Sequence, residues 1–111
     1  DIDAELGDGS SSLDLVAELH PTAAVAGTPT AAALEVIREL EASDRGLYGG
    51  PVGWVDGNGD GKWAIALRSA QVEGDGVIRA FAGAGIVRDS DPENELAETR
   101  LKFRPVVEAF G

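Results

Sequence analysis

Apolar residues in the first part of the chain recur at the spacing of a helix face. After a Gly-rich opening in residues 1–9, the serines at positions 10–12 offer N-caps for a short helix. The apolar residues that follow at helical spacing are Leu13, Val16, Ala17 and Leu19. This helix should end at His20, because a residue that precedes a proline is pushed out of the α region.

A second helix is predicted from a proline near its start. Thr28 can act as N-cap with Pro29 at the first helical position, and the helix should run to about Glu41. Its apolar face consists of Ala33, Leu34, Ile37 and Leu40. Residues 43–50 contain three glycines and predict a turn region.

The middle of the chain reads as short strands joined by tight turns. Residues 52–55 and 63–67 are apolar runs separated by residues 56–61, a loop of Asp, Asn and Gly that is typical of a hairpin. Residues 77–81 predict a third strand after the turn at residues 73–76. Consecutive strands with such turns predict a three-stranded antiparallel meander.

The last element is predicted to be a helix. Asp91 and Pro92 open it, it should run from Glu93 to about Ala109, and Pro105 should kink or end it. The order of helix, helix, three strands and helix defines an α+β fold class. A three-stranded sheet leaves its edges exposed, so we expect the fold to be incomplete without further segments.

The amino-acid composition limits the classes of molecule that the protein can be expected to bind. Twenty acidic residues against nine basic ones give a net charge of −11, which repels phosphate backbones and anionic lipids, so neither nucleic acid nor membrane is expected as a partner. The absence of cysteine excludes disulfides, thiolate metal sites and a cysteine nucleophile. It is compatible with a reducing cytoplasm, where we expect the protein. An anionic ligand would need a metal ion or clustered Arg and Lys.

Residues 56–61 match the first half of a calcium-binding EF-hand loop. The twelfth position, which needs a bidentate glutamate, is Leu67, and the flanking segments are strands. We therefore interpret these residues as a plain hairpin loop. The single histidine, His20, cannot build a zinc site by itself and is interpreted as a capping or packing residue.

Three charged residues share one face of the last helix. Glu95, Glu98 and Lys102 lie at positions i, i+3 and i+7. Glu98 and Lys102 can form an exposed ion pair. Alternatively, Glu98 binds a hard cation such as magnesium through oxygen while Lys102 meets a substrate carboxylate. The spacing alone leaves both interpretations open.

Further candidates lie at the ends of predicted strands. Gly83 and Gly85 flank Ala84, and this segment either lets backbone amides approach an anion or forms a bulge. Arg68 ends an apolar strand and either extends its charge to solvent or binds a carboxylate. Tyr48, in the Gly-rich turn, either contacts a ligand or is an aromatic residue at the edge of the core.

In this order and spacing the segments resemble a known family. The matching strings are LHPTAAVAGTP (residues 19–29), DRGLYGGPVGW (44–54), ALRSA (66–70), FAGAGIV (81–87) and SDPENELAETRLK (90–102). They are similar to the chorismate-utilising enzymes: isochorismate, salicylate, anthranilate and aminodeoxychorismate synthases. The first string lacks a lysine after Pro29, which resembles the isochorismate synthase pattern. Salicylate synthases tend to have Thr where Ala24 stands, so the product implied is isochorismate.

The resemblance implies a magnesium-dependent isomerisation of chorismate to isochorismate. It implies Glu98 and Glu95 as metal ligands, and its implied substrate contacts are Ala24, Tyr48, Arg68, Gly83, Ala84, Gly85 and Lys102. Salicylate synthase, which also eliminates pyruvate, is the main alternative. A small acidic partner-binding domain is the alternative from a non-enzyme class.

The resemblance also implies that part of the site lies elsewhere. In the family the general base lysine, the general acid glutamate and another metal-binding glutamate come from upstream segments. We therefore expect residues 1–111 to be the C-terminal portion of a single chorismate-binding domain, to require that N-terminal part as a partner, and to be inactive alone. The resemblance does not separate enzymes of menaquinone biosynthesis from those of siderophore biosynthesis.

Overall fold

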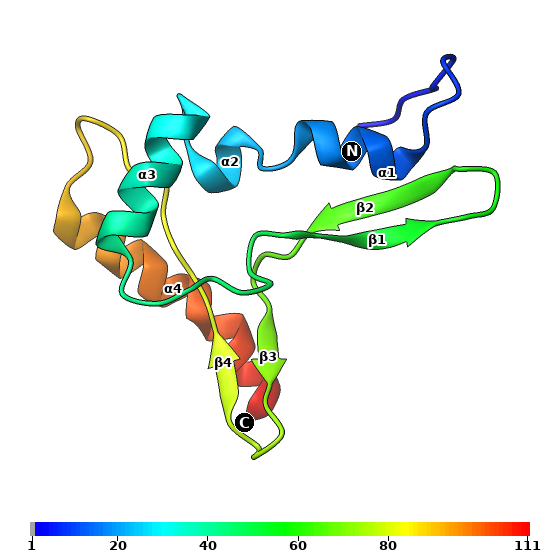
Figure 1. Ribbon diagram of the computed structural model, residues 1–111. Coiled ribbons are helices and arrows are strands. Elements are labelled where there is room, and N and C mark those ends of the chain that lie inside the picture. The colour runs from blue at the N-terminus through cyan, green and yellow to red at the C-terminus, as the bar shows by residue number, and fades with distance from the viewer. Residues whose placement is uncertain (1) are drawn as a thin grey trace.

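The computed structural model describes residues 2–111 as helices and two separate antiparallel hairpins in an open arrangement (Figure 1). In chain order the elements are α1 (Ser12–Leu19), α2 (Ala23–Ala26), α3 (Thr30–Leu40), β1 (Pro51–Val55), β2 (Gly61–Ile65), β3 (Ala70–Val72), β4 (Ile78–Ala80) and α4 (Pro92–Phe110). The presence of helices together with antiparallel strands confirms the α+β fold class. Within the described residues, no helix has both the length and the apolar character needed to cross a membrane.

The first predicted helix is confirmed as α1, and its start is fixed by a reciprocal cap. The Ser11 hydroxyl accepts from the Asp14 backbone N–H, and the Asp14 carboxylate accepts from the Ser11 backbone N–H at 2.9 Å. His20 ends the helix, and its N–H donates to the Val16 carbonyl. His20 therefore has the capping role that the sequence favoured.

The α1 helix packs on the β1–β2 hairpin. Ser12 donates its backbone N–H to the Gly59 carbonyl at 2.8 Å, and its hydroxyl accepts from the Trp63 indole at 3.3 Å. In the hairpin loop, the Asp56 carboxylate accepts from the N–H groups of Asn58 and Asp60. These bonds are those of a turn, as expected for residues 56–61.

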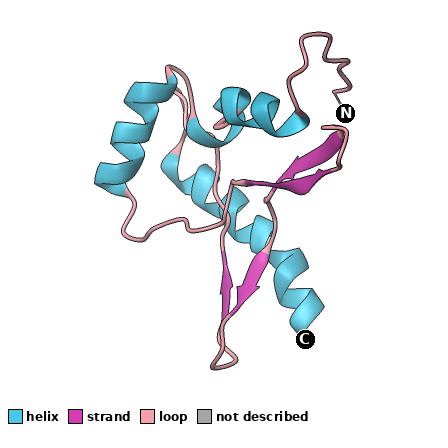
Figure 2. Ribbon diagram, turned by 45° about the vertical axis from the view of Figure 1, so that its right-hand side comes forward, coloured by secondary structure: helices cyan, strands magenta, loops and turns pink. Residues whose placement is uncertain are grey.

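The predicted three-stranded meander is wrong. The segment 78–80 pairs with β3, a strand that was not predicted, and not with β2. The β1–β2 ladder ends where Gly49 and Gly50 exchange hydrogen bonds with Ala66. The chain then leaves the extended direction at Arg68, whose φ of 50° lies in the left-handed region. The two hairpins consequently point in different directions (Figure 2).

The predicted start of the second helix is also corrected. Residues 23–26 form the short helix α2, and α3 begins at Thr30 with Pro29 as N-cap. The Pro29 carbonyl accepts the first helical hydrogen bond, from Ala33 N–H at 3.0 Å, so Thr28 lies outside the helix. Gly27 separates the two helices with a φ of 89°, a conformation that favours glycine.

The last helix does not end at Pro105. Asp91 caps α4 by accepting from the Asn94 N–H at 2.9 Å, and the helix continues through Pro105 to Phe110. A proline removes one helical hydrogen bond, the one to the carbonyl of residue Leu101. Leu101 is 68% exposed, so the position of the missing bond lies at the surface of the helix.

Many large apolar residues are exposed in this structure. Ala26 and Gly49 are the buried residues of the described range. The accessible surface is 8809 Å², against about 5,800 Å² for a compact monomer of this mass. The radius of gyration is 16.5 Å, against about 13 Å for a compact domain of this length. The elements therefore present apolar faces that they do not cover for one another.

Candidate functional site

Two aromatic rings join the turn before β1 to the segment after β4. The rings of Tyr48 and Phe81 stack with centroids 5.3 Å apart and planes 14° from parallel. A Cβ built on Gly83 would lie 3.9 Å from the Tyr48 hydroxyl oxygen. The structure thus brings Tyr48 beside the glycine segment that the sequence singled out.

Lys102 connects the same glycine segment to α4. Its Nζ donates to the Gly83 carbonyl oxygen at 3.0 Å and pairs with Glu98 Oε1 at 2.6 Å. The Lys102 side chain is 29% exposed and that of Glu98 is 55% exposed. Tyr48 lies beside Gly83, and Lys102 joins Gly83 to Glu98, so these four predicted site residues form one contact chain of near neighbours.

The glycines at 83 and 85 are not required by packing within this chain. A Cβ on Gly83 would make an ordinary contact, and one on Gly85 would meet no atom within 4 Å. Neither glycine has a positive φ, so backbone conformation does not require glycine either. Ala84 between them is half-buried.

The α4 carboxylates offer part of a metal site. Glu95 and Glu98 lie one turn apart on the same helix face, with Glu95 half-buried and Glu98 exposed. Residues 2–111 contain no group of three or more His, Cys, Asp or Glu that could hold a metal. Two carboxylates fit magnesium as a partial set, because this ion usually takes one or two protein carboxylates and completes its shell with water and substrate.

Two predicted residues lie apart from this contact chain. Arg68 is exposed, follows β2, and is the one non-glycine residue of the described chain with a positive φ. Non-glycine residues in this region are uncommon and cluster at functional sites. Ala24 is exposed on α2. Within the described residues, 2–111, neither Arg68 nor Ala24 is joined to Lys102 or Glu98 by a hydrogen bond or an ion pair.

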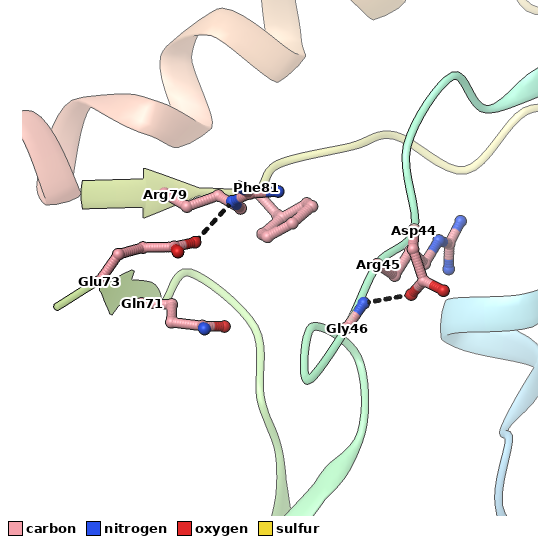
Figure 3. Close-up of a pocket in the computed structure, with 7 residues that line it drawn as sticks. All are labelled: Asp44, Arg45, Gly46, Gln71, Glu73, Arg79 and Phe81. Carbon is pink, nitrogen blue, oxygen red and sulfur yellow. Dashed lines mark hydrogen bonds and ion pairs between the residues drawn. The ribbon is translucent and has the colours of Figure 1, made fainter. Parts of the chain in front are cut away.

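A cavity of about 240 Å³ opens next to the stacked rings. Figure 3 shows Phe81 and the Glu73–Arg79 ion pair of the β3–β4 hairpin facing the loop at Asp44. The residues that line it are Asp44, Arg45, Gly46, Gln71, Glu73, Arg79 and Phe81. None of the predicted site residues is among them, so the cavity borders the contact chain without containing it.

A comparison with known protein families shows to which family the chain belongs. The sequence profile described as "Chorismate binding enzyme" matches residues 1–111, the whole chain. The chain belongs to the chorismate-binding enzyme family. Because the profile matches every residue, the likeness of the motifs to this family is not a coincidence.

Curated relatives and a solved structure agree with this family. Isochorismate synthase MenF from Bacillus subtilis is 45% identical over 96% of this chain and 22% of its own length. Isochorismate synthase DhbC from the same organism is 50% identical over 99% of this chain and 28% of its own length. A crystal structure described as a 2,3-dihydroxybenzoate-specific isochorismate synthase, DhbC, from Bacillus anthracis matches with a TM-score of 0.92 and 47% identity, over 97% of this chain and 29% of that one. The chain spans about a quarter of the length of the curated relatives it matches.

The amino-acid sequence did not point to Arg45, which makes several contacts near the candidate residues. Arg45 donates to the Val25 carbonyl at 2.8 Å and forks onto Glu41 at 2.6 and 2.9 Å. Its guanidinium carbon also lies 6.0 Å from the centre of the Tyr48 ring. The hydrogen bond from Arg45 lowers the pKa of Glu41, and Glu41 in turn raises the pKa of Arg45. The sequence feature that could have pointed to Arg45 is its position four residues after Glu41 and three residues before Tyr48.

Proposed function

We propose that the intact protein is an isochorismate synthase, which isomerises chorismate to isochorismate with magnesium. The observation that carries this proposal is the match to proteins named isochorismate synthases over 96% and 99% of the chain. The chain spans only about a quarter of those relatives, so the proposal concerns the whole protein. Ala24, where salicylate synthases tend to have threonine, supports isochorismate as the product.

The substrate contacts proposed are the seven residues that the resemblance implied. Chorismate carries two carboxylates, and this chain offers Lys102 and Arg68 as cations toward them. The glycines at 83 and 85 support a ligand role, because neither packing nor φ demands glycine there. Tyr48 and Lys102 both meet this segment, so a carboxylate bound beside it would be within reach of both side chains.

The metal ligands proposed are Glu98 and Glu95. Magnesium, when bound there, would offset the charge of a substrate carboxylate and assist departure of a hydroxyl. Lys102 holds the Glu98 carboxylate at 2.6 Å, so it limits the positions from which Glu98 can reach an ion. This cation and the metal together would let a chain of net charge −11 accept a dianion.

We further propose that upstream segments of the same enzyme complete the domain. They would supply the general base lysine, the general acid glutamate and another metal-binding glutamate. The exposed apolar faces support this, since Leu40, Leu47 and Ile86 are 72–78% exposed in this chain. Residues 1–111 would then be the C-terminal portion of a single chorismate-binding domain, in a cytoplasmic enzyme.

Product analysis tests the proposed function. The intact protein is incubated with chorismate and magnesium, and the products are separated by chromatography and identified by NMR. Isochorismate as the sole product is expected. Salicylate together with pyruvate would replace the proposal by a salicylate synthase, and unchanged chorismate would overturn it.

A further inference from the structure

We propose that Arg45 is a positioning residue that holds the Tyr48 ring and helix α2 in place for the substrate. The proposal rests on the proposed function, because it assumes that Tyr48 and Ala24 meet chorismate. Arg45 lies in the matching string DRGLYGGPVGW, and the resemblance implied no role for it. Its contacts reach both elements at once, from the turn that follows α3.

Three of the five N–H donors of Arg45 are engaged within the chain. Nε and Nη2 bond to the two oxygens of Glu41, at the C-terminal end of α3, and Nη1 bonds to the Val25 carbonyl, next to Ala24. The charge of the guanidinium is therefore balanced by Glu41 within the chain. Because these bonds tie Arg45 to α2 and to the end of α3, we assign it the role of fixing neighbouring elements.

The geometry links these bonds to the aromatic pair. The Arg45 guanidinium carbon lies 6.0 Å from the Tyr48 ring centre, at the limit of a cation–π contact. Tyr48 also stacks on Phe81, and its N–H donates to the Arg45 carbonyl at 3.0 Å. Side chain and backbone of one arginine thus constrain the ring whose hydroxyl faces Gly83.

Lysine could not replace this arrangement. A planar guanidinium can fork onto a carboxylate while a third N–H reaches a carbonyl, whereas an ammonium is a compact charge without that fork. Arg45→Lys should keep a cation near the ring and lose the simultaneous bonds to Glu41 and Val25. It is therefore expected to fall between the wild type and Arg45→Met.

A double-mutant cycle on the intact protein tests the proposal. Arg45→Met should raise the KM for chorismate about tenfold while kcat at saturating magnesium changes little. Adding Arg45→Met to Tyr48→Leu should raise KM no further, because the two changes remove the same constraint. Arg104→Met is the matched control, since Arg104 makes the same 2.6 Å pair with Glu108 but touches no proposed site residue.

An unchanged KM in Arg45→Met, or additive effects in the double variant, would overturn the proposal. If Arg45→Met does not fold, Arg45→Lys takes its place, with a KM rise of about threefold expected and an unchanged KM contradicting it.

Hydrogen exchange without substrate separates this proposal from the enzymatic one. Arg45→Met should speed amide exchange in residues 22–27 and 46–50, and Arg104→Met should not. Unchanged exchange in both segments would overturn the role of Arg45 even in a protein that leaves chorismate intact. Absent turnover by the wild type would instead count against the proposed function.

Discussion

Single side chains carry the contacts of the proposed site, and Lys102 carries two of them. One joins α4 to the Gly83 carbonyl, and the other holds Glu98. The Glu98–Lys102 pair was predictable, because residues four apart on a helix face each other. The bonds from Lys102 to Gly83 and from Arg45 to Val25 span 19 and 20 residues. No sequence period encodes such contacts, so they emerged only from the fold.

Removing the ammonium of Lys102 should impair substrate use. In the intact protein, Lys102→Met is expected to lower kcat/KM for chorismate by about 10- to 100-fold, the size of one lost charged hydrogen bond. Steady-state kinetics with isochorismate detection measures this. Arg104→Met, in the same helix, should leave kcat/KM unchanged, and equal losses in both variants would contradict the role of Lys102.

Glu41 should make a small acid-sensitive contribution to stability. Arg45 lowers the pKa of Glu41 below its ordinary value of 4.5, so the folded state holds the charged form more tightly than the unfolded state does. This stability is present above pH 4.5 and is lost as pH falls through the lowered pKa.

Urea unfolding of the intact protein at neutral and acidic pH measures that contribution. Glu41→Gln should lower the free energy of unfolding by up to about 1 kcal/mol at neutral pH, since the pair is partly exposed. The difference from wild type should shrink as pH falls through the lowered pKa of Glu41. A difference that stays constant with pH would argue against the ion pair.

Most helices and strands form where the local sequence pattern predicts them, and the main exception lies around the bend at Arg68. The N-cap of α1, the β1–β2 hairpin and the Asp91 cap of α4 match the prediction, since caps and tight turns are encoded by neighbouring residues. Residues 77–81 were predicted as a strand and contain β4, but β3 escaped prediction because its three residues are too few for alternation to show. Arg68 turns the chain there with a backbone conformation that the sequence does not announce.

The junction of α2 and α3 should depend on Gly27. Its φ is 89°, and an added Cβ would lie 2.9 Å from the Ala33 Cβ. Gly27→Ala is therefore expected to lower the free energy of unfolding of the intact protein by about 1 kcal/mol or more, measured by urea titration. Gly57→Ala is the control, because Gly57 has no positive φ and no neighbour within 4 Å. Equal stability of the two variants would refute the strain at Gly27.

The whole molecule is too open to bury its own apolar faces. Its surface of 8809 Å² exceeds that of a compact chain of this mass by about 3,000 Å². The sequence indicated this openness through a sheet with exposed edges, but it did not show that the strands split into two hairpins. Half of the proposed site, including its acid and base, is expected on segments that would cover these faces.

Activity should therefore require the rest of the enzyme. Purified chain 1–111 with chorismate and magnesium is expected to form no isochorismate, because the general base and general acid are proposed to lie upstream. Co-expression with the remaining part of the intact protein should restore turnover. Isochorismate formation by the isolated chain would show that residues 1–111 hold a complete catalytic set.

Glu98 of α4 is proposed to bind the magnesium of an isochorismate-forming site. The most direct test is the magnesium dependence of chorismate turnover by the intact protein carrying Glu98→Gln, compared with Glu108→Gln. Both glutamates pair with a cation four residues away at 2.6 Å, Glu98 with Lys102 and Glu108 with Arg104, so each variant removes one such ion pair from α4. Glu98→Gln is expected to lose at least about 100-fold in magnesium-dependent turnover while Glu108→Gln retains it. Wild-type magnesium dependence in Glu98→Gln would contradict the account.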